Sequence, residues 1–393
     1  SDLQIQKTKR QTWQGEETPN LTEPRTALAK LINLLSWRPG HSGFGSYVQR
    51  LVPELDGWRL QLDENGKGVL LPSEQWSAVA PPQAPTFLMR LLQSNAMAQH
   101  GLNLRDVLRG SKIGIEDLEV IYSPFFEALL CFPQIPQLIT CHDLTPLTLP
   151  KSRRAWLKYR FWQPKHLQCA TRVIAISRHV ANQLIAFGLP ADRISVVPNG
   201  IRIVRPALSA PASEDLVVLA RHDANKNLIA LVRALATVQT RLPHWHGVVR
   251  IIGREGKSTP AIQRYQRALP RPDGLECIPS MDSETLLQTL RGSLALVSAS
   301  LDEGFDYPVL EAKAEGLPTL ISSIPVHQEF HQDSSLFFPA DDDGTVLTEH
   351  LSTLLKDHSA WRQLSAAGRH LAQSLSIQRQ AESIRPLISN LAR

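Results

Sequence analysis

Two glutamates separated by seven residues stand at the start of a predicted helix in the last third of the chain. Glu303 lies on the loop from Leu301 to Asp306, and Glu311 lies in the first turns of the helix. We expect Asp306 to cap this helix and Pro308 to occupy its first turn. Free N–H groups at a helix start attract phosphate, and carboxylates suit hydroxyls, so the stretch indicates a site for a nucleotide sugar. The alternative is a helix with an ordinary acidic first turn.

Two cations follow the predicted strand from Leu216 to Ala220, in the sequence ARHDANKN. Arg221 and Lys226 bracket a loop whose backbone can fold to bring both charges over one diphosphate. Arg offers a planar fork and Lys a point charge, and both are common phosphate partners. The alternative is a pair of unrelated surface cations near a helix start.

A histidine and an aspartate follow another predicted buried strand, from Leu138 to Cys141. His142 can donate and accept hydrogen bonds, so we expect it to position a sugar or supply electrostatics, with Asp143 beside it. The alternative is a loop histidine whose hydrogen bonds are satisfied within the fold.

A glycine-rich turn contains Gly40, Gly43 and Gly45, after the first predicted strand and before a helix. Without side chains, its backbone N–H groups can approach a phosphate. The spacing G-x-x-G-x-G differs from the dinucleotide fingerprint, but Asp63 near the end of the next strand keeps a nicotinamide cofactor open as an alternative. A tight turn without a ligand is the other alternative.

Length and composition limit the class of protein. The 393 residues suit two domains, and 42% hydrophobic with 20% charged residues is typical of globular chains. The net charge of +5 is spread along the chain, which argues against nucleic acid as a partner but suits a cleft that holds a diphosphate.

The location of the protein is predicted from apolar runs and cysteines. No apolar run approaches the roughly 18 residues that span a bilayer, and the N-terminus lacks the apolar core of a signal peptide. The four cysteines show no metal-ligand spacing and are typical of buried free thiols in a reducing compartment. We therefore expect a cytoplasmic protein.

Alternating strand and helix patterns run through both halves and predict an α/β fold with two doubly wound parallel sheets, joined by a proline-rich linker at residues 198–212. In the first half we expect strands at 31–37, 58–62, 120–122, 137–141, 172–176 and 194–197, and helices at 47–55, 87–100, 151–169 and 177–187. In the second half we expect strands at 216–220, 248–252, 275–278, 295–297 and 318–321, and helices at 228–238, 261–269, 283–290, 308–316, 359–373 and 377–391.

Four motifs in order resemble the retaining glycosyltransferases of family 4. They are E-G-F-x-x-P-x-x-E followed by A-x-x-x-G-x-P, R-x-x-x-x-K-N after a strand, P-N-G before the linker, and the glycine-rich first loop. The resemblance covers roughly residues 29–393 and implies a GT-B fold, with two Rossmann-like domains facing a central cleft. It implies an acceptor-binding domain at 27–198, a donor-binding domain at 199–373, and a last helix, about 374–393, that crosses back to the first domain. Residues 1–26 are expected to be a flexible polar leader.

The resemblance also implies roles for single residues. Arg221 and Lys226 would hold the diphosphate, Glu303 the sugar hydroxyls and Glu311 the ribose. The nucleobase would lie on the loop that contains Met281. Together with His142, these two cations and Glu303 form the expected catalytic group, and the other expected donor-binding residues are Gly43, Gly45, Asp143, Met281, Gly304, Phe305, Asp306, Pro308 and Glu311. The resemblance implies no metal and no cofactor beyond the nucleotide sugar itself.

The implied reaction moves a sugar, mannose or glucose among the candidates, from a GDP- or UDP-linked donor to a glycan or lipid-linked acceptor with an α-linkage. Asp306 and Tyr307 replace the commoner Gly-Leu of the motif, and Ala314 and Glu315 replace the commoner Ala-Cys, which leaves the donor sugar open. Two alternatives remain: a non-catalytic nucleotide-sugar-binding subunit, and a same-fold epimerase or phosphorylase.

Residues 151–166, KSRRAWLKYRFWQPKH, combine six cations with four aromatic residues. Basic and apolar positions interleave around the predicted helix instead of separating into two faces. This pattern predicts a packed connecting helix with snorkelling cations. The alternative is weak association with a membrane surface, which would place the protein peripherally at the inner membrane.

Overall fold

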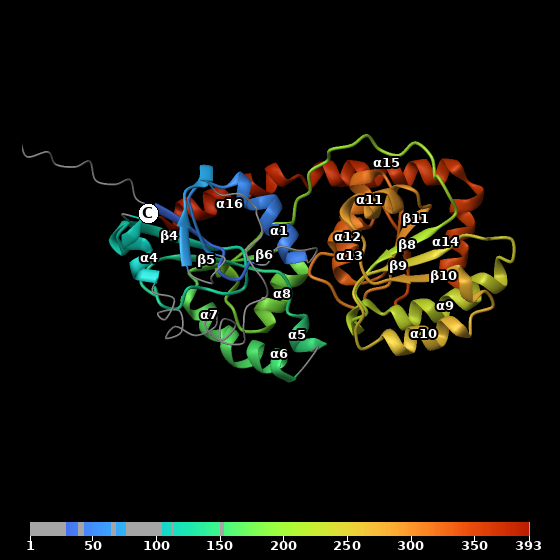
Figure 1. The fold of residues 1–393 in the computed structure, drawn as a ribbon, viewed down its shortest axis with the longest axis horizontal. Coiled ribbons are helices and arrows are strands. Elements are labelled where there is room, and N and C mark those ends of the chain that lie inside the picture. The colour runs from blue at the N-terminus through green and yellow to red at the C-terminus, as the bar shows by residue number, and fades with distance from the viewer. Residues whose placement is uncertain are drawn as a thin grey trace, which may run out of the picture.

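Two β-sheets, one in each half of the chain, organise the computed structural model (Figure 1). The structure describes residues 29–37, 43–63, 68–75, 104–111, 113–149 and 153–392. The predicted leader at 1–26 and the predicted helix at 87–100 lie outside these ranges.

The first sheet has seven strands in the order β3-β2-β1-β4-β5-β6-β7. Every neighbouring pair is parallel except β2 and β3, which are antiparallel. Its inner strands are apolar runs because helices cover both faces of a parallel sheet. The strands are β1 (Ala29–Asn33), β2 (Trp58–Leu62), β3 (Gly68–Leu71), β4 (Leu118–Ser123), β5 (Gln137–Cys141), β6 (Arg172–Ala175) and β7 (Ile194–Val196).

The second sheet has six strands, all parallel, in the order β10-β9-β8-β11-β12-β13. Its strands are β8 (Leu216–Leu219), β9 (Val249–Ile252), β10 (Leu275–Ile278), β11 (Ala295–Ser298), β12 (Thr319–Ser322) and β13 (Leu336–Phe338). In both sheets the strand order reverses next to the first strand, between β1 and β4 and between β8 and β11. Ligands of doubly wound sheets bind outside the carboxyl ends of the strands at this switch point. The predicted fold class is confirmed.

Helices connect the strands in both halves. Those of the first half are α1 (Gly43–Leu51), α4 (Leu104–Gly110), α5 (Thr145–Thr148), α6 (Arg153–Leu157), a π turn (Lys158–Trp162), α7 (Gln163–Cys169) and α8 (Arg178–Ala186). Those of the second half are α9 (Leu228–Arg241), α10 (Thr259–Arg267), α11 (Ser283–Arg291), α12 (Tyr307–Glu315), α13 (Pro325–His331), α14 (Thr345–Lys356), α15 (His358–Ser374) and α16 (Ile377–Leu391).

Several predicted boundaries were wrong. β1 ends at Asn33, four residues before the predicted end, and α1 begins at Gly43, so two of the glycines lie in its first turn rather than in a loop before it. β3, β13, α13 and α14 were not predicted at all. β3, β13 and α13 are short, and only some of their residues are buried.

The last helix returns to the first half of the molecule. Ile384 and Ile388 of α16 are buried in the same apolar cluster as β4 and β5 (Figure 1). The turn before α16 pairs with the linker, because the Gly200 N–H donates to Gln380 Oε1 at 2.8 Å and Ile201 forms an isolated β-bridge with Ser376. The start of α16 therefore holds the linker against the first half through these contacts.

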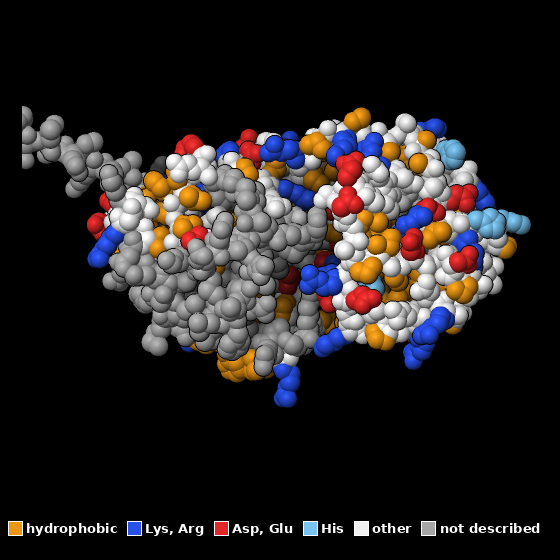
Figure 2. Space-filling view, in the orientation of Figure 1, with side chains coloured by type: hydrophobic (Ala, Val, Ile, Leu, Met, Phe, Trp, Pro, Cys, Tyr) orange, Lys and Arg blue, Asp and Glu red, His pale blue; other side chains and the backbone are white. Residues whose placement is uncertain are grey.

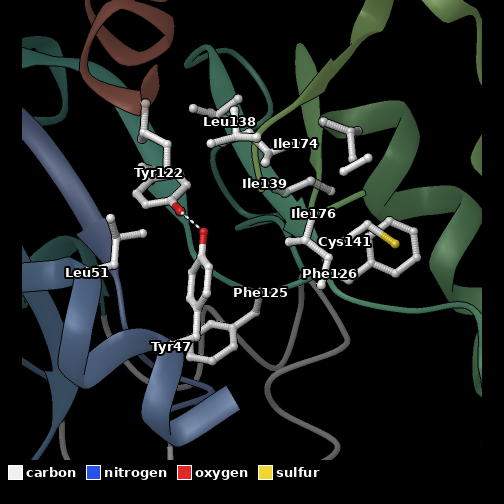
Figure 3. Packing of buried hydrophobic residues seen from close by; sticks show 14 of the residues in the cluster. Tyr47, Leu51, Tyr122, Phe125, Phe126, Leu138, Ile139, Cys141, Ile174 and Ile176 are labelled. Atoms are coloured by element: carbon white, nitrogen blue, oxygen red, sulfur yellow. Dashed lines mark hydrogen bonds between the residues drawn. The ribbon is translucent and has the colours of Figure 1, made fainter. Parts of the chain in front are cut away.

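The core of the first half contains a short chain of hydroxyl groups. Tyr47 and Tyr122 lie fully buried with their hydroxyls 3.0 Å apart (Figure 3). The Tyr122 hydroxyl also lies 3.1 Å from Thr140 Oγ1. Burial raises the pKa of Tyr122 to about 12, so this chain is neutral. The four cysteines are free, and Cys131 and Cys141 are buried.

The basic aromatic stretch differs from its prediction. It is helical from Arg153 to Cys169, but Trp156, Leu157 and Phe161 are exposed rather than packed. No helix within the described residues is long and apolar enough to cross a membrane.

Candidate functional site

The loops that follow β8 and β11 meet at the switch point of the second sheet. Lys226 ends a 3₁₀ turn after β8, and its Nζ lies 2.5 Å from Glu303 Oε1 on the loop after β11. Ser300 Oγ donates to the same carboxylate oxygen at 2.8 Å, and the Leu301 N–H donates to the Asn225 carbonyl at 2.7 Å. The structure thus brings together one cation and one carboxylate of the expected catalytic group.

Burial and neighbouring charges both shift the pKa values of this ion pair. Burial raises the pKa of Glu303, and the Lys226 ammonium opposes that rise. Burial alone would lower the pKa of Lys226, but the carboxylates of Glu303 and Asp306 outweigh burial and raise it. Lys226 is therefore positively charged at neutral pH.

Asp306 has a different role from the predicted one. It stands at the N-cap position of α12 in a left-handed conformation with φ 65°, and its side chain makes no capping hydrogen bond. Instead, the buried carboxylate accepts from Ser298 Oγ at 2.6 Å and lies 3.0 Å from His327 Nε2. The predicted N-cap position of Asp306 is confirmed, but its carboxylate turns inward to these partners instead of capping the helix.

His327 links Asp306 to the backbone. Its Nδ1 lies 2.8 Å from the carbonyl of Ser322, and its Nε2 lies 3.0 Å from Asp306 Oδ2. Burial tends to raise the pKa of Asp306, but Lys226 and His327 outweigh it and hold the pKa well below its usual range. His327 and Asp306 thus form a fully buried hydrogen-bonded pair next to Lys226 and Glu303.

Arg221 lies apart from the buried pairs. Its side chain is 57% exposed, and its Nη2 lies 3.3 Å from Asp223 Oδ2. Both predicted diphosphate cations therefore come from the loop after β8, but only Lys226 faces Glu303.

The loop after β5 supplies His142 from the first half of the molecule. Its Nε2 donates to the Pro124 carbonyl at 2.8 Å, and its ring meets Tyr47 edge-on at 4.5 Å between centroids. Burial lowers the pKa of His142 to about 4, although the Pro124 carbonyl raises it. At neutral pH the residue is a neutral imidazole with its hydrogen on Nε2.

At Gly304 the loop after β11 packs tightly against the loop after β5. A Cβ at this position would lie 1.7 Å from the His142 carbonyl oxygen and 3.4 Å from Asp143 Cβ. No other residue fits there without moving one of the loops. The contact brings the predicted His-Asp pair next to the loop that carries Glu303. Figure 2 shows acidic and basic side chains gathered where the two halves meet.

Glu311 has a partner that the sequence did not reveal. Arg50, from α1 in the first half, donates through Nη2 to Glu311 Oε1, and its guanidinium lies 4.7 Å from the centre of the Tyr307 ring. The carboxylate expected to hold a ribose is therefore oriented by an arginine of the other half.

The remaining predicted donor-binding residues lie on several different elements. Pro308 lines a small hollow with Lys226 and Ser298, and Met281 lies on the loop after β10, where its sulfur accepts from Thr289 at 3.5 Å. Phe305 is buried, and its ring packs on Tyr307 and Phe330. Gly43 and Gly45 lie in the first turn of α1. No ligand contact is needed to explain the burial of Phe305.

Arg50 and His327 were both missed by the reasoning from sequence. His327 lies in the first turn of α13, shortly after β12. It therefore stands beyond the carboxyl end of a strand that adjoins β11. That position was a usable signal. The only signal for Arg50 was its place in the helix that begins at the glycine-rich turn. Within the described ranges, no cluster of three or more His, Cys, Asp or Glu could hold a metal ion.

Comparisons of sequence give two family models that together match most of the chain. The model of Glycosyltransferase Family 4 matches residues 71–205, and the model of Glycosyl transferases group 1 matches residues 213–357. The O-antigen chain mannosyltransferase RfbU of Salmonella typhimurium is 23% identical over 208 residues, which cover 53% of this chain and 58% of RfbU. The serotype-specific mannosyltransferase WbdA of Escherichia coli is 24% identical over 413 residues, which cover 89% of this chain and 49% of WbdA. The chain spans about half the length of these curated relatives.

Solved structures share the fold. Anabaena HepE in complex with UDP and glucose aligns with a TM-score of 0.68 at 15% identity, covering 92% of this chain and all of that one. Sucrose-phosphate synthase from Thermosynechococcus elongatus aligns with a TM-score of 0.66 at 19% identity, covering 92% and 98%. The two family models meet at the linker between the two sheets, and the E-G-F-x-x-P-x-x-E motif lies at the second switch point. The chain belongs to glycosyltransferase family 4 and has the GT-B fold.

Proposed function

We propose that this chain is a retaining hexosyltransferase that moves a sugar from a nucleotide-diphosphate donor to an acceptor hydroxyl and forms an α-linkage. The observation that carries the proposal is the partly buried ion pair of Lys226 and Glu303 at the switch point of the second sheet. A cation and a carboxylate at such an edge suit the two chemical parts of a nucleotide sugar, the diphosphate and the hydroxyl-rich ring.

Each charged residue has a proposed task in the reaction. Lys226 and Arg221 stabilise the negative charge that builds on the departing diphosphate. Glu303 binds hydroxyls of the sugar ring, and Glu311, oriented by Arg50, binds the ribose. His142 is neutral, so it positions the sugar through hydrogen bonding and does not act as a cationic acid.

The sugar and the acceptor are proposed from the relatives. RfbU and WbdA are named as mannosyltransferases, which supports mannose as the transferred sugar, with glucose as the second choice. A solved neighbour holds UDP and glucose, so both GDP-linked and UDP-linked donors belong in the test. A glycan or lipid-linked acceptor in polysaccharide synthesis fits the names of the O-antigen relatives.

The test is a donor panel followed by a transfer assay. GDP-mannose, UDP-glucose and UDP-galactose are compared for their effect on the melting temperature, since a ligand at 100 times its Kd stabilises by about 2.7 kcal/mol. The stabilising donor is then labelled and followed by hydrolysis or transfer, with and without chelator. We expect turnover in chelator, because side-chain cations take the place of a metal at the diphosphate. Stabilisation without any turnover would leave the non-catalytic binder as the better account.

A further inference from the structure

A helical stretch on the surface of the first half exposes aromatic and aliphatic side chains. It runs from Arg153 to Cys169 through α6, the π turn and α7. Trp156 is 39% exposed, Leu157 45% and Phe161 60%. Among the described residues seven large hydrophobic side chains are exposed, and three of them lie within these six positions. Such clustering marks an interaction surface, whereas single exposed hydrophobic residues do not.

The apolar side chains share one face of the helix with cations. Arg153 and Arg160 are exposed like the three apolar residues, so all five side chains lie on the solvent side of the stretch. The Arg160 guanidinium lies 5.9 Å from the centre of the Phe161 ring. We name this surface the aromatic–basic face; it consists of Arg153, Trp156, Leu157, Arg160 and Phe161.

The opposite side of the same stretch is anchored in the protein. The Gln163 side chain donates to the Phe126 carbonyl, and His166 Nδ1 accepts from the Ala128 N–H at 3.0 Å. Both side chains are buried. The aromatic–basic face is therefore held outward by the fold. Figure 2 shows hydrophobic side chains exposed at the lower edge of the first half, beside projecting basic side chains.

The segment of sequence that contains this face carries charges of a single sign. From Leu144 through Ala191 the sequence contains eight Lys and Arg and no Asp or Glu, although the whole chain has 37 acidic residues. A surface of this kind is complementary to anionic phospholipid headgroups, while Trp and Phe side chains favour the boundary between headgroups and acyl chains.

We propose that the aromatic–basic face docks this protein on an anionic lipid bilayer. Trp156, Leu157 and Phe161 enter the interfacial layer, and the two arginines bind lipid phosphates. The prediction that this helix packs its apolar side chains was wrong for Trp156, Leu157 and Phe161, which are exposed. Docking on a bilayer accounts for the combination of aromatic and basic residues on one surface. The docking itself does not rest on the proposed function.

The position of the face relates docking to the candidate site. α5 lies between His142 and α6, and Thr145 Oγ1 at its start donates to Asp302 Oδ2 at 3.4 Å. Asp302 precedes Glu303 on the loop after β11. A docked bilayer would therefore lie beside the loops of the candidate site, which suits a lipid-linked acceptor if the proposed function holds.

The experiment is cosedimentation of the full chain with vesicles of phosphatidylglycerol and, separately, of phosphatidylcholine. We expect binding to phosphatidylglycerol that weakens with salt and little binding to phosphatidylcholine. Trp156→Ser/Phe161→Ser should weaken binding about tenfold, through lost apolar burial. Arg153→Glu/Arg160→Glu should weaken it about twentyfold or more, at roughly fivefold per lost basic residue.

Matched controls change equally exposed residues elsewhere. Ile185→Ser/Val204→Ser removes two exposed apolar side chains, and Arg264→Glu/Arg267→Glu reverses two exposed charges on α10. Both controls should bind vesicles like the wild type. The proposal is overturned if the wild type does not bind phosphatidylglycerol, if the controls lose as much binding as the test variants, or if the test variants change only the oligomeric state. Melting temperatures with a donor, measured without vesicles, report on the proposed function separately.

Discussion

Three carboxylates at the candidate site each pair with a basic side chain of the protein. The pairs are Lys226 with Glu303, His327 with Asp306, and Arg50 with Glu311. Because a buried charge is costly without a partner, a donor that binds here must share these partners or take them over. This exchange gives each residue a different expected phenotype.

The two glutamates should fail in different ways. Glu311 is expected to contact the ribose, which does not change during transfer, so Glu311→Gln should chiefly raise the donor KM. Glu303 is expected to face the sugar ring, whose charge and shape change as the bond breaks, so Glu303→Gln should chiefly lower kcat, with some activity left. Steady-state kinetics with varied donor at saturating acceptor measure both.

Arg50 provides the control for this pair of predictions. If it only orients Glu311, Arg50→Lys should raise the donor KM by less than Glu311→Gln and leave kcat close to the wild type. The assignment is reversed if Glu311→Gln loses only kcat while Glu303→Gln loses only donor affinity.

Substitutions of Lys226 and Arg221 should both lower turnover but should differ in their effect on stability. Losing either charge should cost roughly 2–4 kcal/mol of barrier, because both act on the departing diphosphate. Arg221 is exposed, so Arg221→Ala should melt like the wild type. Lys226→Ala leaves the partly buried Glu303 without its cation and should lose about 1–3 kcal/mol of stability. Lys226→Ala/Glu303→Gln should regain most of the stability but not the turnover. Wild-type rates in both single variants would remove the two cations from the mechanism.

His142 should make the folded state sensitive to acid. Its pKa is about 4 in the folded protein and about 6.5 when unfolded, so unfolding takes up a proton as the pH falls through this window. The free energy of unfolding should therefore fall by up to about 3 kcal/mol between pH 6.5 and pH 4 through this residue. His142→Asn, which can still donate to the Pro124 carbonyl, should lose less stability over the same window. Denaturant unfolding at several pH values, with both proteins in parallel, measures the difference. Equal losses would mean that His142 titrates normally.

At the scale of elements, the sequence predicts what is local and long enough to be periodic. The strands β8 and β11, the loops after them and α12 followed from apolar runs with Gly and Pro at their ends. The antiparallel β3 and the short β13 did not, because three or four half-buried residues carry little periodicity. The Asp306–His327 pair was out of reach for another reason: it joins two loops through tertiary packing, and each residue alone resembles an ordinary cap or helix residue.

The stretch 151–169 shows a related limit. Its interleaved residues fit a helix packed on one side and exposed on the other, and periodicity alone does not say which side is which. The π turn from Lys158 to Trp162 also shifts the register in the middle of the stretch. The buried anchors Gln163 and His166 decide the orientation, and their partners are carbonyl and N–H groups that leave no trace in the sequence.

Gly304 is the point where one loop depends on another. A methyl group there would overlap the His142 carbonyl at 1.7 Å, so Gly304→Ala should push apart the loops after β5 and β11. We expect turnover to fall by about tenfold or more while each half stays folded, since a small displacement of catalytic groups is costly. The measurements are kcat and circular dichroism. A matched substitution, Gly110→Ala, has open space around the new methyl group and should leave turnover unchanged.

On the scale of the whole molecule, carboxylates of the second half join the two halves by accepting hydrogen bonds from the first half. Glu329 of α13 accepts from the N–H groups of Arg178 and His179 at 2.8 and 3.1 Å, at the start of α8 in the other half. His179 Nε2 lies 3.0 Å from Asp302 Oδ1, on the loop that also carries Glu303. A carboxylate at a helix N-terminus satisfies free donors and the helix dipole together.

Removing this contact should favour separation of the halves. Glu329→Ala leaves two N–H groups at the start of α8 without their carboxylate, a loss of about 1–2 kcal/mol that shifts the ratio of separated to joined arrangements by roughly 5- to 30-fold. We expect the radius of gyration from small-angle X-ray scattering to increase in the absence of a donor, and to return toward the wild-type value when a saturating donor bridges the halves. Glu349→Ala, on the surface of α14 and away from the other half, is the matched control and should scatter like the wild type. An unchanged radius in Glu329→Ala, together with an unchanged donor KM, would show that the α13–α8 contact does not set the arrangement of the two halves.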